Sequence, residues 1–306
     1  MIKVQNSTKA NFGLTLITLV WGVSFVLLDV CIAGGATPAF INLVRGAIYL
    51  VCITAVGFKK IFPMTKKEAV YGFGAGAANA VAYLLQAYGL QYAKPSTGAF
   101  LTTLYIVLVP LMTLILFRKK VPFKLLPAVL LSVVGAAILS GIGSESMAWG
   151  KGEWLCLAGA FAFALSIALL GNAGEEVRPL NTAWWVALTQ TLFGLVLFLC
   201  TETQAVKGMN FGAVWLPLLG LGVGCSFLAS TVQVLAQKYT DAGVAAVLMA
   251  LEGVFGAIFS VAFGREPFVW QTAVGGALIF VGALIAVFPL REILQKRGKH
   301  TAKKCD

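Results

Sequence analysis

Charged residues are scarce in this chain. Only 11% of its 306 residues are Asp, Glu, Lys or Arg, whereas a soluble domain carries about a quarter. The mean hydropathy is +0.89, and uncharged stretches of about 20 residues, long enough to cross a bilayer as helices, recur along the sequence. The composition excludes an ordinary soluble protein and predicts an all-α polytopic membrane protein.

Histidine is scarcer still, because His300 near the C-terminus is the only one. A Ser-His protease site or a His-containing metal site within the membrane is therefore excluded. The six cysteines show no CxxC or Cys/His spacing, and the sequence has no GxxxxGK[ST] phosphate-binding loop. We expect no metal, no cofactor and no ATP hydrolysis within this chain.

Positive charge is unevenly placed along the sequence. The net charge is +11, and Lys and Arg gather in short runs beside the apolar stretches, as at Lys59 and Lys60, at 118–120 and at 291–304. Such runs are topology signals that stay in the cytoplasm, where they attract anionic lipids. The expected partners are therefore membrane lipids rather than nucleic acid, and both termini are expected on the inner side of the cytoplasmic membrane.

Charge clusters, prolines and glycines divide the chain into ten expected transmembrane helices. The first is interpreted as a retained helix, because its apolar core is longer than the roughly 7–15 residues of a signal peptide. Pro38 suits the start of the second helix, and Asp241 offers a capping oxygen to the ninth. The expected spans are 12–30, 38–57, 69–91, 96–117, 123–142, 153–171, 181–200, 211–236, 242–263 and 268–289.

The two halves of the sequence resemble each other. At an offset of 147 residues, Gln86 aligns with Gln233, Tyr92 with Tyr239 and Arg118 with Arg265. The pattern predicts a first five-helix repeat at 1–145, a second at 146–290 and a basic cytoplasmic tail at 291–306. Because five is an odd number, the repeats must insert with opposite orientation. Inverted repeats of this kind are typical of secondary transporters, whose substrate site lies near the bilayer midplane.

Several local motifs occur in a characteristic order. They are VWGVSF in the first helix, INLVRGAIYL in the second, YAKPSTGAFLTTLYIVLVP leading into the fourth, LEGVFGAIFSVAFGRE in the ninth and GGALIFVGALI in the tenth. Across essentially its whole length the chain resembles the EamA family of the drug/metabolite transporter superfamily. The resemblance implies a ten-helix carrier of small metabolites, often amino acids, commonly moved outward. The family usually has Pro after the ninth-helix Glu, where this chain has Gly253.

Glu252 is the only charge in the stretch AVLMALEGVFGAIF. A charge at the bilayer centre costs at least ~2.5 kcal/mol on insertion scales, so this side chain must face protein or water rather than lipid. It either exchanges protons or binds a substrate amine, or it is a buried carboxylate with fixed partners. The repeat offset pairs Glu252 with Tyr105, which is then either a second polar group across a cavity or a core aromatic with one hydrogen bond.

Arg45 is the only basic residue in the interior of an expected span, since Lys124 stands at the second position of the fifth. It could bind a substrate carboxylate, although an Arg in this position more often extends its guanidinium to the interface or pins helix ends. Asp29, near the outer end of the first helix, could pair with Arg45 or cap a helix.

The third helix carries Asn79, Tyr83 and Gln86 on one face, since their spacing is i, i+4 and i+7. Gln233 repeats Gln86 in the eighth helix. In a membrane such amides either line a cavity or join helices. Trp21 and Ser24 fall in the middle of the first helix, where they suit a cavity wall or a gate.

The inverted repeat and these polar residues together predict a secondary transporter that works by alternating access, and the resemblance to the EamA family implies that it exports small metabolites. Proton antiport through Glu252 is the preferred coupling, and an uncoupled facilitator of the same fold is the alternative. A membrane-embedded enzyme would need His/Asp or Asp/Arg clusters at the interface, and the acidic residues here are scattered. A membrane subunit that does not transport would not need matched polar residues at the same depth in both halves.

Overall fold

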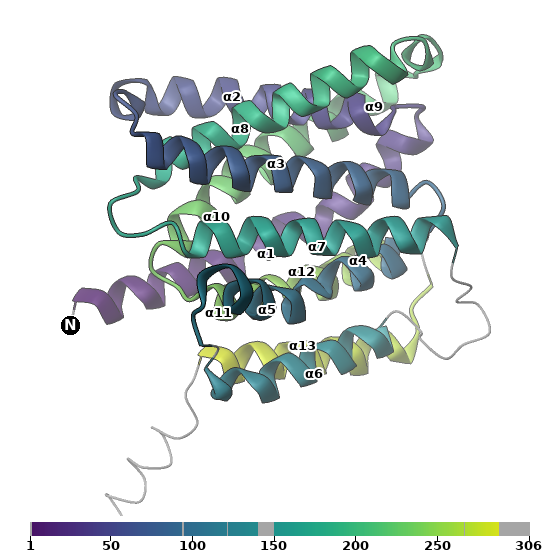
Figure 1. Cartoon of the computed structure of the whole chain (residues 1–306). Helices are drawn as coiled ribbons and strands as arrows, with labels where there is room; N and C mark the ends of the chain where they lie inside the picture. The colour runs from purple at the N-terminus through teal and green to yellow at the C-terminus, as the bar shows by residue number, and fades with distance from the viewer. Residues whose placement is uncertain (1, 94, 121, 140–149, 266, 288–306) are drawn as a thin grey trace, which may run out of the picture.

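The protein is a bundle of long helices, shown in Figure 1. The computed structural model describes residues 2–93, 95–120, 122–139, 150–265 and 267–287, and every regular element in this part of the chain is helical. The predicted tail at 291–306 and the predicted boundary between repeats at residues 145 and 146 lie outside the described residues.

The first half of the chain starts with three long helices. Pro38 occupies the first turn of the second, as the sequence predicts. Thr65 and Glu68 form a capping box at the start of the third. The elements are α1 (Ile2–Ala33), α2 (Pro38–Ile61), α3 (Lys66–Gly89), α4 (Pro95–Thr103), α5 (Tyr105–Phe117), a 3₁₀ turn (Phe123–Leu125) and α6 (Leu126–Leu139).

The second half has more irregular helices. Asp241 caps α11 through a hydrogen bond from the Gly243 amide, as predicted. The elements are α7 (Lys151–Gly171), α8 (Pro179–Leu197) with a π-helical end (Phe198–Glu202), a 3₁₀ turn (Ala205–Gly208), α9 (Phe211–Leu219), a π-helical stretch (Gly220–Ala229), α10 (Ser230–Gln237), α11 (Ala242–Met249), α12 (Leu251–Ala262) and α13 (Trp270–Val287).

Two helices break within one residue of the same place in the two repeats. Leu104 separates α4 from α5, and Ala250 separates α11 from α12. The backbone angle ψ at these residues is −11° and −17°, compared with about −42° in a regular α-helix. Their carbonyl oxygens accept i→i−3 hydrogen bonds from the amides of Val107 and Gly253, which tighten the turn. Each break therefore starts a new helix at the residues where the sequence analysis places its two central polar groups, Tyr105 and Glu252.

Eight helices are long and apolar enough to cross a membrane. They span Asn6–Ala33, Pro38–Ile61, Thr97–Phe117, Lys151–Gly171, Pro179–Glu202, Phe211–Gln237, Ala242–Ala262 and Trp270–Val287. Large apolar side chains lie on the outer surface, among them Val56 at 72% and Phe58 at 65% exposure. Such a surface fits hydrocarbon rather than water, so the chain is a multi-pass membrane protein.

Helices from the two halves pack against each other. The main contacts join α2 to α8, α3 to α7 and α8, α1 to α12, and α6 to α13. The α6–α13 pair is especially close, because a methyl group on Gly135 would lie 2.6 Å from the carbonyl oxygen of Gly275. Small residues permit this approach between membrane helices.

We expect Gly135→Ala to destabilise the protein by about 1–3 kcal/mol, because the added methyl group must push two backbones apart. Gly74→Ala is the matched control, since its methyl group would meet a flexible Leu169 side chain at an ordinary 3.5 Å. Thermal unfolding of the purified protein in detergent measures both. Equal unfolding midpoints for the two variants would contradict the close packing of α6 and α13.

The third helix is tied to α8 at both ends. At one end the Glu68 carboxylate accepts hydrogen bonds from the Arg178 amide and guanidinium, at 3.1 and 2.7 Å, and from the Asn181 amide, at 2.9 Å. At the other end the Tyr88 hydroxyl donates to Glu202, which follows α8. These contacts hold α3 and α8 in a fixed relation along their length.

Candidate functional site

A polar cavity lies inside the bundle, among α1, α3, α5, α7, α10, α11 and α12. It brings together all of the predicted site residues except Arg45, from both halves of the chain. The side chains that line it are Trp21, Ser24, Phe25, Asn79, Tyr83, Gln86, Tyr105, Phe163, Ser166, Ile167, Gln233, Met249 and Glu252.

Glu252 and Tyr105 meet in this cavity. The Tyr105 hydroxyl donates to the Glu252 carboxylate at 3.1 Å, and the two residues are 8% and 3% exposed. The ion pairs between described residues do not include Glu252. Glu252 lies two residues after the turn at Ala250, within the span Ala242–Ala262.

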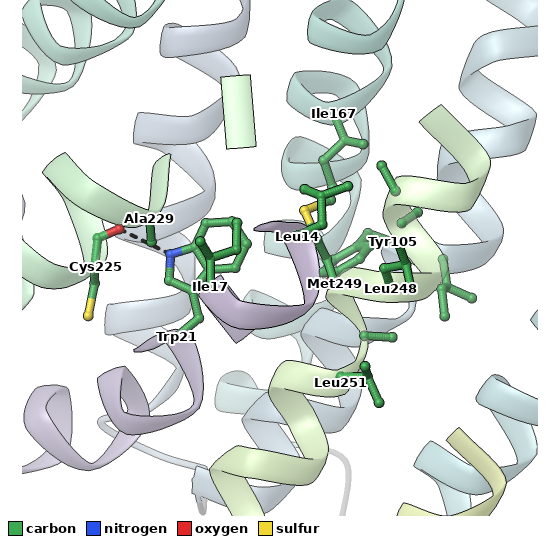
Figure 2. Packing of buried hydrophobic residues seen from close by; sticks show 14 of the residues in the cluster. Leu14, Ile17, Trp21, Tyr105, Ile167, Cys225, Ala229, Leu248, Met249 and Leu251 are labelled. Atoms are coloured by element: carbon green, nitrogen blue, oxygen red, sulfur yellow. Dashed lines mark hydrogen bonds between the residues drawn. The ribbon is translucent and has the colours of Figure 1, made fainter. Parts of the chain in front are cut away.

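Trp21 connects α1 to the irregular part of the second half. Its indole Nε1 donates to the carbonyl oxygen of Cys225 at 3.1 Å, which Figure 2 shows as a dashed line. Cys225 belongs to the π-helical stretch, and its carbonyl oxygen also accepts a hydrogen bond from the Ser230 hydroxyl at 3.4 Å. The Ser24 hydroxyl donates back to the Trp21 carbonyl at 2.6 Å. Trp21 is therefore a fixed wall of the cavity in this conformation.

The polar residues of α3 face the cavity with unused hydrogen-bonding capacity. The Gln86 amide donates to the Thr102 hydroxyl at 3.4 Å, whereas the Asn79 Oδ1 atom has no protein partner. Across the cavity, the hydroxyl of Ser166 on α7 also lacks one. Buried polar atoms normally have partners, so these two atoms are available to water or to a bound molecule. Gln233 of α10 lines the same cavity and is 5% exposed.

Arg45 lies behind the cavity wall. Its guanidinium carbon is 3.8 Å from the centre of the Tyr83 ring, and its Nε donates to the Ser226 hydroxyl at 2.8 Å. The residue is 4% exposed, so it does not extend to the interface. Asp29 does not pair with it, because Asp29 forms an ion pair with Arg265 at 3.2 Å. Tyr83 therefore separates Arg45 from the cavity space.

The cavity is small in this conformation. The space open to water inside it is about 30 Å³, enough for about two water molecules, whereas pockets for small ligands measure about 300–1,000 Å³. Helices must therefore move before a molecule larger than water can enter.

The sequence did not single out the apolar part of the lining. Phe163 contacts the rings of Tyr83 and Tyr105, with centroid distances of 5.2 and 6.5 Å. Figure 2 shows Ile167 and Met249 near Tyr105. Nothing distinguishes these residues from lipid-facing ones in the sequence, although Ser166 stands out as the single hydroxyl group in the span of α7.

We expect Tyr105→Phe to weaken apparent substrate affinity about tenfold, because it removes a hydrogen bond to a carboxylate in the cavity. The ring still packs against Phe163, so the protein should fold. Tyr239→Phe is the control, since Tyr239 is 48% exposed and does not line the cavity. Concentration dependence of flux in proteoliposomes measures the effect, and equal affinities in the two variants would contradict a role for the Tyr105 hydroxyl.

A multi-pass helical protein with a polar internal cavity has the architecture of a membrane transporter. The model of the EamA-like transporter family matches residues 8–141 and again residues 150–288. These matches cover most of the chain, which therefore belongs to the EamA-like transporter family, within the drug/metabolite transporter superfamily.

Relatives and a solved structure agree with this assignment. An uncharacterized transporter of Archaeoglobus fulgidus is 28% identical over 276 residues, covering 90% of this chain and 85% of the relative. The uncharacterized transporter YetK of Bacillus subtilis is 22% identical over 209 residues, covering 67% of this chain and 63% of YetK. A crystal structure with 18% sequence identity superposes with a TM-score of 0.74 over 94% of this chain and 99% of its own. That last similarity shows a shared fold.

Proposed function

We propose that the protein is a secondary transporter that exports small metabolites, such as amino acids or related amphipathic compounds, across the cytoplasmic membrane. The observation that carries this proposal is the buried Glu252–Tyr105 pair in a polar cavity built by both halves of the chain. Ionisable groups inside a membrane mark substrate and proton paths.

The proposed topology has ten spans in two inverted repeats, with both termini in the cytoplasm. The two separate matches to the family model support the repeat, and so do the matching helix breaks at Leu104 and Ala250. The eight long apolar helices account for most of the spans, and α3 and the shorter α6 supply the other two. Discontinuous helices that meet near the midplane are typical of transporters with inverted repeats.

Transport in this proposal proceeds by alternating access. The cavity is too small for a metabolite, so the conformation described corresponds to a closed form. Opening toward either side would expose Asn79, Ser166 and Glu252 to substrate and water. Glu252 then binds a proton on one side and releases it on the other, which couples proton entry to substrate export.

Uncoupled facilitated diffusion is the second candidate. The hydrogen bond from Tyr105 favours this candidate, because the hydroxyl satisfies the Glu252 carboxylate without a proton from solution. A pH gradient applied to proteoliposomes separates the two candidates.

Cells that express the protein provide the test of substrate class. We expect them to release specific amino acids or similar amphipathic compounds into the medium faster than cells that carry the empty vector, as measured by untargeted mass spectrometry. Reconstituted protein should then move the same compounds. A medium that matches the empty-vector control, together with inactive liposomes, would contradict the proposed export.

A further inference from the structure

A second cavity lies one helical turn beyond the central one, toward the end of the molecule that holds the N-terminus. The space inside it is about 190 Å³, compared with about 30 Å³ in the centre. It is formed by the connection between α7 and α8, the end of α10 and the residues that follow α5. The α7–α8 connection lies on the same side of Figure 1 as the N-terminus, which is the cytoplasmic side in the proposed topology.

The two cavities follow the same two helices but share no lining residue. On α7 the central cavity ends at Ser166 and Ile167, and the second begins at Leu170. On α10 the central cavity includes Gln233, and the second includes Val234 and Gln237. A spacing of three or four residues keeps side chains on one helical face, so the second cavity continues the line of the first.

Gln237 lines the second cavity and contacts a residue of the central one. Its Nε2 donates to the carbonyl oxygen of Ile167 at 3.2 Å, and this bond joins α10 to α7. The side chain is buried, at 2% exposure, and its Oε1 has no protein partner. A buried amide with one free acceptor is poorly satisfied, so this contact can be exchanged for one with a passing molecule.

The lining of the second cavity favours anions. Lys119 and Lys238 belong to it, together with one carboxylate, that of Glu175. The Lys238 ammonium group donates to the carbonyl oxygen of Val177 at 3.3 Å, which holds its charge beside the cavity. The two ammonium groups outnumber this carboxylate, and an excess of positive charge in a cleft raises the local concentration of anionic ligands.

From these observations we infer that the second cavity is the cytoplasmic mouth of the transport path. The mouth selects molecules that bear a carboxylate or a similar anionic group. Gln237 closes the passage from the mouth to the central cavity. The inference rests on the proposed function, which it deepens by naming the side of access, the charge of the ligand and a gating residue.

Thiol labelling tests the mouth without knowledge of the substrate. In a parent whose Cys52, Cys200 and Cys305 are replaced by Ser, Val234→Cys reports on the second cavity in inside-out vesicles. Two methanethiosulfonate reagents are compared, an anionic sulfonatoethyl and a cationic trimethylammonium-ethyl derivative. We expect the labelling rate of the anionic reagent, divided by that of the cationic one, to fall about tenfold when Lys119→Gln and Lys238→Gln are added. Lys120→Gln, next in sequence but outside the lining, is the matched control and should leave the ratio unchanged.

Asn172→Cys, on the other wall of the cavity, serves as a second reporter if Val234→Cys does not fold. A ratio that does not respond to the Lys119 and Lys238 changes, or responds equally to Lys120→Gln, would overturn the anion selectivity.

The gate is tested with Ser166→Cys, which reports on the central cavity. From the cytoplasmic side, labelling should be slow with Gln237 present and about tenfold faster or more with Gln237→Ala. Leu235→Ala, on the same helix but 38% exposed on its outer face, should not accelerate it. Equal rates in Gln237→Ala and Leu235→Ala would overturn the gate.

Flux measured on the same parent separates this inference from the proposed function. If labelling is charge-selective and Gln237→Ala accelerates it, but no transport occurs, the inference about the second cavity is supported and the export activity is contradicted. Transport without either labelling effect would contradict the mouth alone.

Discussion

Replacement of Glu252 by Gln is expected to abolish the acceleration of substrate flux by a pH gradient while preserving exchange of substrate for substrate. Gln keeps the size of the side chain and can still accept the hydrogen bond from Tyr105, which is 3.1 Å away. It cannot carry a proton. Binding and rocking of the halves should therefore continue, and only the link to proton movement should be lost.

Proteoliposomes with and without an imposed pH gradient measure this effect. Glu176→Gln is the control, because Glu176 lies in the connection between α7 and α8, pairs with Lys67 and is not part of the lining of the central cavity. That hydrogen bond with Lys67 lowers the pKa of Glu176, so the control also replaces a charged carboxylate at neutral pH. A Glu252→Gln protein that still responds to the gradient would refute the proton role and favour the uncoupled facilitator.

The second large effect concerns stability. Glu68→Ala should lower the midpoint of thermal unfolding in detergent by roughly 3–8 °C, because it removes the capping box of α3 and the partner of Arg178 and Asn181 together. The Glu68 side chain is fully buried, so water cannot replace these contacts. Glu176→Ala breaks an exposed ion pair and should shift the midpoint little.

A Glu68→Ala protein as stable as Glu176→Ala would show that the carboxylate does not hold α3 to α8. If it is destabilised as expected, its flux should also fall, because the α3 residues Asn79 and Tyr83 position one wall of the cavity.

Much of the site could be predicted because polar atoms are conspicuous in a membrane span. Glu252, Asn79 and Gln86 each interrupt an apolar run. A polar side chain that faces lipid costs free energy, so each of these must face protein or a cavity. The repeat offset added Tyr105, which the structure brings within hydrogen-bonding distance of Glu252. The long apolar spans were equally visible, since length and hydropathy set them.

Other features depend on packing that a linear pattern does not contain. Phe163 and Met249 line the cavity although their sequence context matches that of lipid-facing residues. The helix breaks at Leu104 and Ala250 involve no Pro or Gly at those residues. The position of Arg45 behind Tyr83 depends on how α2 packs, and the partner of Asp29 is Arg265, which is distant in sequence.

Proton movement during substrate transport is the most direct measurement of the central claim. Proteoliposomes that contain a pH-sensitive dye are given an outward gradient of the exported compound, and internal pH is followed. The account predicts that the wild-type protein moves protons against the direction of substrate and that Glu252→Gln moves none while still exchanging substrate. Identical proton movement in the two proteins would contradict it.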